Sequence, residues 1–344
     1  MNVLYHLTIL PPRLPGCDAV VQEVSALQAR LGGWVTYLNP NGRSPVYVPR
    51  VGFGFHKLAK IRRLEKSVQV HNVFNADLFP FPVLHCLRRP VVYSLTGGVS
   101  ETRPLSATSP WLRSLRFLPI ITVTDLRSLE LLQKQGFSNV TLVRPGVDTH
   151  RFTETQQAIR SEVRLMVGSA PWNRTQFRQK GIAALLCAVQ RSPRLFLVFL
   201  WRGVLAEEMN DRVRRMGIAD RIVVLNRKVD VNQVLAGVHA SISLATDPSI
   251  VIPYPHSLIE SLAAGKPIIL SRSIAMADYV QQKGCGLVVD HVTPDDILSA
   301  VDQLVEHYES LREAARQTGR ADFAMDALIQ SFQRVYESVT ASSQ

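Results

Sequence analysis

The chain has 344 residues, about twice the length of a typical domain, so two domains with separate cores are expected. Hydrophobic residues make up 46% and charged residues 19%, which excludes a disordered chain, and no apolar run approaches the roughly 20 residues of a membrane span. Residues 1–150 carry 17 Lys and Arg against 8 Asp and Glu, whereas residues 151–344 carry 22 against 20, so most of the net charge of +11 lies in the first half.

The first residues and the cysteines bear on the compartment. Residues 1–7 lack the basic flank and long apolar stretch of a signal peptide and indicate a first buried strand. Four scattered cysteines show neither the spacing of a zinc site nor that of a disulfide framework: Cys17, Cys86, Cys187 and Cys285. We therefore expect a protein of the cytoplasm, in a reducing environment.

Short apolar runs alternate with helical patterns along the whole chain, which predicts parallel strands joined by right-handed crossovers. In the first half the pattern predicts, in chain order, strands at 3–10, 34–38, 68–73, 91–95, 120–123 and 140–143, with helices at 19–31 and 126–135. In the second half it predicts strands at 163–167, 195–201, 222–225, 240–244, 268–270 and 287–289, with helices at 181–190, 207–216, 231–238, 257–264, 295–316 and 324–339.

A turn-rich passage at 144–152 separates the two halves. We predict an α/β protein with domains at 1–150 and 151–322 and a C-terminal helix within 323–344. In this architecture a ligand is expected at the carboxyl ends of the strands, in a cleft between the halves.

Residues 253–269 combine a helix start, an acidic residue and a strand. Pro253 and Pro255 prevent regular structure before the helix, and Gly265 with Pro267 ends it. Glu260 then lies about one turn into a helix whose N-terminal amides attract phosphate, where a carboxylate can accept hydrogen bonds from sugar hydroxyls. The segment therefore fits a nucleotide-sugar site, and it fits an ordinary αβ unit with a solvated glutamate equally well.

Two segments of the first half, 57–66 and 111–118, concentrate the positive charge. Both mix basic and apolar residues, which is typical of a surface that meets an anionic membrane or an acidic acceptor. A solvated helix face with an arginine-rich turn is an equally good interpretation. We expect no nucleic-acid partner, because no nucleic-acid-binding motif occurs.

Five passages in order resemble the group-1, family-4-type glycosyltransferases with the GT-B fold. They are the loop Pro11-Pro12 to Pro15-Gly16, the strand and glycines at 91–98, the stretch 121–152 with its Pro-Gly-Val-Asp turn, Gly168 followed by 180–188, and 253–269. The resemblance implies two Rossmann-like parallel-sheet domains facing a central cleft, with the C-terminal helix packing back on the first domain. It also implies a nucleotide-diphosphate sugar as donor and neither a cofactor nor a metal ion.

The resemblance assigns roles to residues. Lys180 would neutralise the donor diphosphate and Glu260 would bind the ribose, and these two are the predicted catalytic residues. The predicted donor-binding residues are Gly16, Gly168, Arg174, Arg178, Lys180, Arg227, Pro255, His256, Ser257, Leu258 and Glu260. Arg174 or Arg178 would replace an arginine that is usual where this chain has Ser169, and Arg227 would lie near the base. On the acceptor side the candidates are His71, Thr96 and Gly97.

The chain departs from the family pattern at two positions. Ile252 stands where a second glutamate is usual, eight residues before Glu260, and Thr96 stands where a histidine is common. The resemblance implies a retaining, metal-independent transferase. The basic first half favours a glycan, polysaccharide or lipid-linked acceptor, reached by peripheral contact with an anionic membrane. The two departures favour an alternative, a catalytically silent GT-B protein that binds nucleotide or a partner glycosyltransferase. A sugar-nucleotide epimerase is a further alternative.

Overall fold

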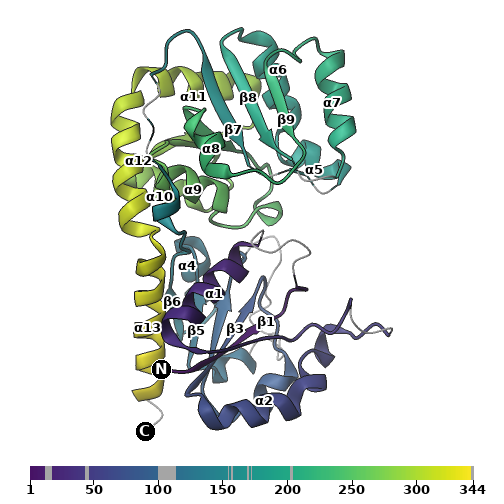
Figure 1. Cartoon of the computed structure of the whole chain (residues 1–344), viewed down its shortest axis with the longest axis vertical. Coiled ribbons are helices and arrows are strands. Elements are labelled where there is room, and N and C mark those ends of the chain that lie inside the picture. The colour runs from purple at the N-terminus through teal and green to yellow at the C-terminus, as the bar shows by residue number, and fades with distance from the viewer. Residues whose placement is uncertain are drawn as a thin grey trace. The chain divides into compact units, whose positions relative to one another are not determined.

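The computed structural model of the protein consists of two compact units (Figure 1). Unit 1 comprises Met1–Pro145 and Met325–Gln344, and unit 2 comprises Gly146–Ala324. The structure describes residues 1–11, 18–42, 46–99, 114–153, 155, 158–168, 170–171, 173–201 and 204–341. Each unit holds a six-stranded parallel sheet, so the predicted α/β architecture is confirmed.

The sheet of unit 1 has the order β2-β1-β3-β4-β5-β6. Its strands are β1 (Val3–Leu7), β2 (Gly33–Tyr37), β3 (Val70–Asn75), β4 (Val91–Leu95), β5 (Ile120–Val123) and β6 (Val140–Leu142). Among its described residues, this unit has the helices α1 (Ala19–Leu31), α2 (Leu58–Leu64), α4 (Leu126–Lys134) and α13 (Met325–Ala341). The chain passes from β1 outward to β2 and then back to β3 on the other side of β1, so the strand order reverses between β1 and β3.

The C-terminal helix α13 belongs to the core of unit 1. Its apolar residues recur at helical spacing and pack on β1, β3 and α1; they are Leu328, Ile329, Phe332, Val335, Tyr336 and Val339. The rings of Phe332 and Phe74 lie 5.7 Å apart. Tyr336 Oη accepts a 2.6 Å hydrogen bond from Asn72 Nδ2, so the buried phenol has a partner. Helix α13 therefore covers part of one face of the unit 1 sheet, over β1 and β3.

The sheet of unit 2 has the order β12-β11-β10-β7-β8-β9. Its strands are β7 (Val163–Val167), β8 (Leu195–Leu200), β9 (Ile222–Leu225), β10 (Ala240–Ser243), β11 (Ile268–Ser271) and β12 (Gly286–Val289). The helices in the described part of this unit are α5 (Arg174–Gln179), α6 (Ile182–Arg191), α7 (Ala206–Arg215), α8 (Val231–Ala236), α9 (His256–Ala263), α10 (Met276–Lys283), α11 (Pro294–Glu306) and α12 (Tyr308–Asp322).

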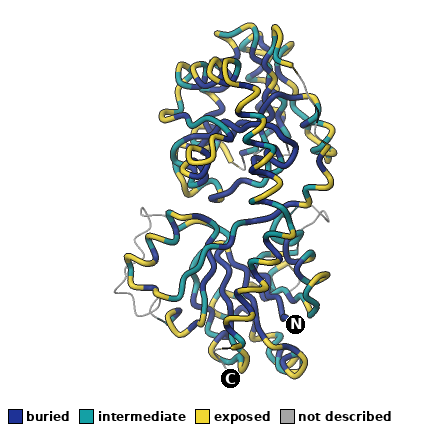
Figure 2. Tube along the Cα trace, turned by 90° about the vertical axis from the view of Figure 1, so that its left-hand side faces the viewer, coloured by how far each residue is buried: buried dark blue, intermediate teal, exposed yellow. Residues whose placement is uncertain are grey.

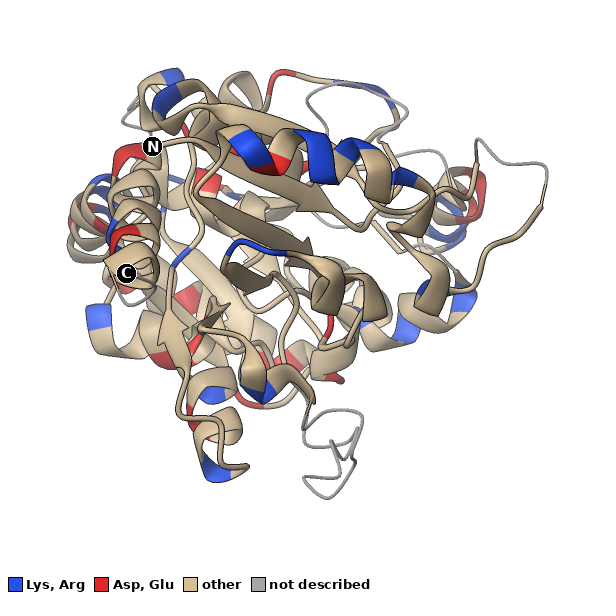
Figure 3. Ribbon diagram, turned by 90° about the horizontal axis from the view of Figure 1, so that it is seen from below, with Lys and Arg blue, Asp and Glu red and all other residues tan. Residues whose placement is uncertain are grey.

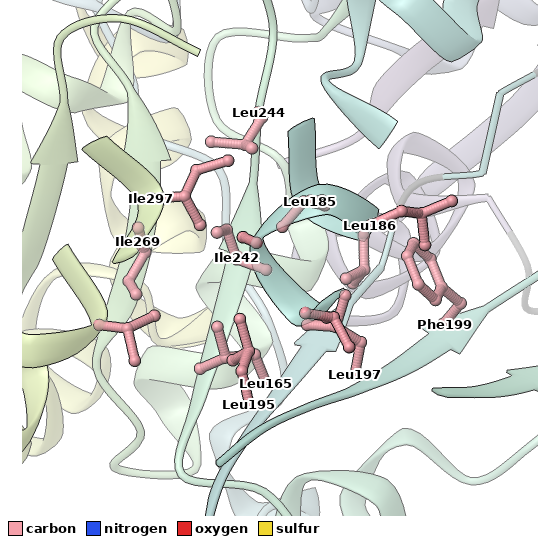
Figure 4. Close-up of a cluster of buried hydrophobic side chains, with 14 of the residues drawn as sticks. Leu165, Leu185, Leu186, Leu195, Leu197, Phe199, Ile242, Leu244, Ile269 and Ile297 are labelled. Atoms are coloured by element: carbon pink, nitrogen blue, oxygen red, sulfur yellow. The ribbon is translucent and has the colours of Figure 1, made fainter. Parts of the chain in front are cut away.

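Helices cover both faces of this sheet, and its strands are accordingly mostly apolar rather than alternating. On one face α6, α7 and α11 bury a cluster that includes Leu165, Leu197 and Ile242 (Figure 4). On the other face α8, α9, α10 and α12 pack over a second cluster. Figure 2 shows buried residues following the strands of each unit.

The prediction of one continuous helix at 295–316 is wrong, because the structure has two helices there. Helix α11 ends at Glu306, and α12 begins at Tyr308. His307, between them, has φ −110° and ψ 20°, outside the helical region. The break redirects the chain, because Ile297 of α11 packs in one core cluster and Ala315 of α12 in the other. The strand predicted to reach residue 10 also ends early, at Leu7.

Candidate functional site

The strand order of unit 2 marks one place on its sheet. From β7 the chain runs outward through β8 and β9 and then returns to β10, which pairs with β7 on the other side. In open doubly wound sheets, ligands bind at the carboxyl ends of the strands where the order reverses in this way. Gly168 directly follows β7, and Leu244 directly follows β10. These two strand ends therefore define the candidate site.

Helix α9 begins at this edge of the sheet. A β-carbon on Gly168 would lie 2.2 Å from Ser257 Cβ and 2.6 Å from Ser257 Oγ, so Gly168, the residue directly after β7, lies on the first turn of α9. The residue before the helix, Pro255, has φ −60° and ψ 123° and provides no side-chain cap. The positive end of the helix dipole, at His256 and Ser257, therefore meets the Gly168 loop, an arrangement that suits an anion.

The position of α9 is fixed by close packing behind it. A β-carbon on Gly319 of α12 would lie 2.2 Å from the carbonyl oxygen of Leu262, so the two helices touch backbone to backbone. Gly265 ends the helix with φ 69°, as the sequence predicted. The backbone amide of Met276 donates to the Pro253 carbonyl at 3.1 Å and fixes the loop that leads into the helix.

Lys180 lies beside the end of β10. It follows α5, and the carbonyl of its neighbour Gln179 accepts a 2.7 Å hydrogen bond from the Thr246 amide. Gly181 has φ 63° and is closely packed: a β-carbon at this position would lie 2.4 Å from Val292 Cγ1 and 3.2 Å from Leu244 Cβ. Only 5% of Lys180 is exposed, and burial lowers the pKa of its ammonium group to about 8. A buried cation of this kind is suited to pairing with a bound anion.

The structure thus places the two central parts of the predicted donor site at adjacent strand ends. Gly168 and the first turn of α9 are in contact, and Lys180 lies against the residues that follow β10. Glu260 is half-buried on α9, one turn after Ser257. The side chain of Leu258 is fully buried in the core, and its amide, the group predicted to contact the donor, donates to the Pro255 carbonyl at 2.9 Å.

The predicted arginines lie farther out. Arg174 is largely exposed and pairs with Glu208 of α7, with Nε 3.2 Å from the carboxylate, which does not support its predicted role at the diphosphate. Arg178 is exposed on the same short helix, α5. Arg227 is exposed beyond β9, the outermost strand, two strands away from β7. Gly16 and Ser169 lie outside the described residues.

The three candidates on the acceptor side do not lie together in the structure. Thr96 and Gly97 follow β4: the Thr96 amide donates to the Asn75 carbonyl at 2.8 Å, and a β-carbon on Gly97 would lie 2.1 Å from the Ala76 carbonyl oxygen. His71 lies near the amino end of β3, with 0% of its surface exposed. Because its side chain is enclosed in the core, the structure does not support a ligand-facing role for His71.

Both ring nitrogens of His71 make hydrogen bonds. Nδ1 lies 2.8 Å from His6 Nε2, and Nε2 lies 3.0 Å from Glu65 Oε1. The same Glu65 oxygen accepts from the Arg88 amide at 2.7 Å, and its other oxygen accepts from Arg62 at 3.0 Å. His71 is therefore part of a buried structural network under α2.

Sequence reasoning missed two features at the strand ends. Ser271, the last residue of β11, holds the turn after β10, because its hydroxyl accepts from the Ala245 amide at 2.8 Å and donates to the Ala245 carbonyl at 2.9 Å. In unit 1, Arg50 and Asp77 form a bidentate ion pair beyond β3. Asp77 could have been found as an acid four residues after a predicted strand, but its partner, distant in sequence, could not.

Comparisons with known proteins agree with this arrangement. Residues 172–322, which include α5, α9 and Lys180, match the family described as "Glycosyl transferases group 1". The chain is 24% identical over 266 residues to an MMP alpha-(1->4)-mannosyltransferase of Mycolicibacterium hassiacum; the match covers 74% of this chain and 60% of that protein's length.

Among solved structures, HepE from Anabaena in complex with UDP superimposes with a TM-score of 0.76 at 14% identity, over 98% of this chain and 100% of that one. Sucrose-phosphate synthase from Thermosynechococcus elongatus superimposes with a TM-score of 0.74 at 14% identity, over 99% of this chain and 100% of that one. At this level of identity the two structures establish the similarity of the fold.

Proposed function

We propose that this chain, which has the GT-B fold, is a group-1 glycosyltransferase that transfers a sugar from a nucleotide-diphosphate sugar to an acceptor. The observation that carries the proposal is the meeting of the Gly168 loop with the first turn of α9, at the strand end beside the buried ammonium group of Lys180. An anion-binding helix terminus and a desolvated cation suit one ligand chemistry, a diphosphate.

The proposed mechanism relies on stabilising the leaving group. As the glycosidic bond breaks, the departing nucleoside diphosphate gains negative charge, and preorganised positive groups lower that barrier. With a pKa of about 8, Lys180 is mostly protonated near neutral pH and interacts strongly because it is buried. We assign the diphosphate to Lys180 and the amides at the start of α9, and the ribose hydroxyls to the carboxylate of Glu260.

We further propose that transfer is of the retaining, family-4 type and needs no metal ion, with Lys180 and the α9 dipole supplying the positive charge. Ile252 is 45% exposed four residues before α9, where a polar contact to the donor sugar would otherwise be expected. This apolar side chain favours the second candidate function, a GT-B protein that binds nucleotide, or a partner glycosyltransferase, without transferring sugar.

Measurements of donor turnover and of nucleotide binding distinguish the transferase from a protein that binds nucleotide without transferring sugar. Purified protein is supplied with UDP-, GDP- and ADP-sugars, and hydrolysis or transfer is measured together with calorimetric binding of the nucleoside diphosphates. We expect Lys180→Ala and Glu260→Ala to lower both activity and affinity, whereas Lys134→Ala and Glu130→Ala, exposed on α4 of unit 1, leave both unchanged. Unchanged activity in both site variants contradicts the proposal, and nucleotide binding without turnover supports the silent protein. Conversion of the free donor to an isomer identifies an epimerase.

The acceptor is proposed to be a glycan or lipid-linked molecule reached at an anionic membrane surface. Helix α2 and its flanks carry exposed Lys60, Arg63 and Lys66, and the Lys and Arg residues follow one another along this helix in the view from below (Figure 3). Phe55, just before α2, is an exposed apolar residue. A cationic segment beside an exposed aromatic ring suits peripheral docking to anionic lipid. Within the described ranges, no helix combines the length and apolarity of a membrane span.

Vesicle flotation tests the docking proposal. We expect the protein to float with vesicles containing anionic lipid at low salt and to be released at high salt, because surface charges are screened. The triple variant Lys60→Glu, Arg63→Glu and Lys66→Glu should not float, whereas Arg30→Glu on α1 should behave as the unaltered protein. Equal flotation of the triple variant would refute this surface.

A further inference from the structure

The loop that leads into helix α9 carries a buried aromatic ring. Tyr254, two residues before the helix, is 4% exposed and belongs to the core cluster that α9, α10 and α12 cover (Figure 1). Pro255, between Tyr254 and the helix, provides no side-chain cap, so tertiary contacts must fix the start of α9. The direction of the first amides of α9 therefore depends on what holds the Tyr254 ring.

Two aromatic rings from other elements hold Tyr254. The ring centroid of Phe323, the residue after α12, lies 5.7 Å from that of Tyr254, and the centroid of Tyr279 on α10 lies 5.9 Å from it. The rings of Phe323 and Tyr279 lie 5.3 Å apart, so all three rings contact one another. Tilted and edge-to-face rings at these separations attract one another in addition to the area that they bury.

The backbone and the neighbours of Phe323 are fixed in turn. Phe323 is fully buried, and its carbonyl accepts a 2.9 Å hydrogen bond from the Val147 amide. Asp322, the residue before it, accepts from Tyr279 Oη at 2.5 Å and pairs with Lys283 Nζ at 3.0 Å. Phe323 is therefore a rigid support for the loop before α9.

The same residue lies where the chain enters and leaves unit 2. This unit begins at Gly146 and ends at Ala324, and Val147 pairs with Ala324 in a parallel bridge. Phe323 contacts the entering segment through its carbonyl and directly precedes the last residue of the unit. One side chain and its backbone thus join the loop before α9 to both connecting segments.

We propose that Phe323 is a positioning residue for the diphosphate site, which sets the direction of the first amides of α9 through the ring of Tyr254. A nucleotide that orders this loop also stabilises the hydrogen bond between Val147 and Phe323, because the coupling between two sites is reciprocal. Phe323 acts from the core and not by contact with the ligand, since it is fully buried. The inference rests on the proposed nucleotide binding by the Gly168 and α9 site.

Calorimetric titration tests this role, with UDP, GDP and ADP as the probes. We expect Phe323→Leu to weaken binding at least about tenfold, because the first amides of α9 lose their alignment. The matched control is Tyr308→Leu, a buried aromatic residue at the other end of α12, which should keep the affinity of the unaltered protein. The double variant Tyr254→Leu, Phe323→Leu should lose less affinity than the sum of the single losses, since both changes remove one contact.

Hydrogen exchange followed by mass spectrometry gives a measurement that a purely structural role would not affect. Saturating nucleotide should slow exchange in the peptide 146–152, which contains the Val147 amide, in the unaltered protein and in Tyr308→Leu. In Phe323→Leu this slowing should be lost. If Phe323→Leu does not fold, Phe323→Met replaces it in both experiments, because it keeps most of the side-chain volume.

The outcomes distinguish this inference from the donor proposal. Weaker binding in Lys180→Ala together with unchanged binding in the Phe323 variant overturns the positioning role alone. Slowed exchange that is equal in the Phe323 variant and the unaltered protein also overturns it. Nucleotide binding that Lys180→Ala leaves unchanged contradicts the donor site, and an unaltered protein that binds none of the three nucleotides overturns both.

Discussion

Gly168 and Ser257 touch so closely that a β-carbon on Gly168 would lie 2.2 Å from that of Ser257, well inside van der Waals contact. The glycine is required here by space, because Ser257 Cβ and Oγ fill the position that a side chain would take. Ser257 Cα, at 3.7 Å, would be in ordinary contact. The contact joins the strand end of β7 to the first turn of α9, so it sets the shape of the proposed diphosphate site.

This relationship predicts a loss of function and its rescue. Gly168→Ala should push the β7 loop away from α9 and weaken binding of the nucleoside diphosphate at least about tenfold, or about 1.4 kcal/mol. Ser257→Gly removes both clashing atoms, so the double variant should bind more tightly than Gly168→Ala alone. Calorimetric titration of all four proteins gives the coupling energy. Additive effects would show that the contact does not shape the site.

A second prediction concerns the pH dependence of nucleotide binding. Burial lowers the pKa of Lys180 to about 8, so the free protein loses this positive charge as the pH rises from about 7 to 9. The terminal phosphate is already ionised over that range, since its last pKa is near 6. The dissociation constant should therefore rise above about pH 8, up to about tenfold per unit. Lys180→Arg keeps its charge and should remove this dependence; an unchanged profile would contradict the assignment.

The same burial predicts that Lys180 is a cost to stability. Its pKa is lower in the folded protein than its ordinary value of 10.5, so the unfolded chain holds the proton more tightly and stability is reduced below about pH 8. Lys180→Met should raise the free energy of unfolding of unit 2 by about 2 kcal/mol near neutral pH, while abolishing nucleotide binding. Calorimetry of both thermal transitions checks this, with Lys134→Met as the exposed control. A destabilised Lys180→Met protein would refute it.

The sequence was sufficient to predict the repeating architecture and the segment around α9, because both are set by local patterns. Pro255, Gly265 and the apolar positions between them define that helix with no tertiary information. The burial of Lys180 could not be predicted, since it depends on packing of the adjacent turn against Val292, more than a hundred residues away. The orientation of His71 was also beyond reach, because every residue of β3 is buried and the strand shows no alternation.

Burial of His71 and His6 leads to the last prediction. Burial lowers the pKa of His6, and the charge of His71 lowers it further. Burial also lowers the pKa of His71, against the opposing effect of Glu65, while Arg62 and Arg89 lower it further. The ordinary histidine pKa is about 6.5, and both pKa values lie below it. Both imidazoles are therefore neutral in the folded protein near pH 7.

When the chain unfolds, these histidines regain their ordinary pKa and bind protons that the folded state excludes. The free energy of unfolding of unit 1 should therefore be highest above about pH 7 and should fall as the pH drops through about 6.5, by up to about 1.4 kcal/mol per pH unit for each histidine. The double variant His6→Leu, His71→Met should flatten this slope between about pH 7 and 5, whatever its absolute stability. Urea denaturation followed at several pH values measures the slope. A slope that is the same in the double variant and the unaltered protein would assign acid sensitivity to other groups.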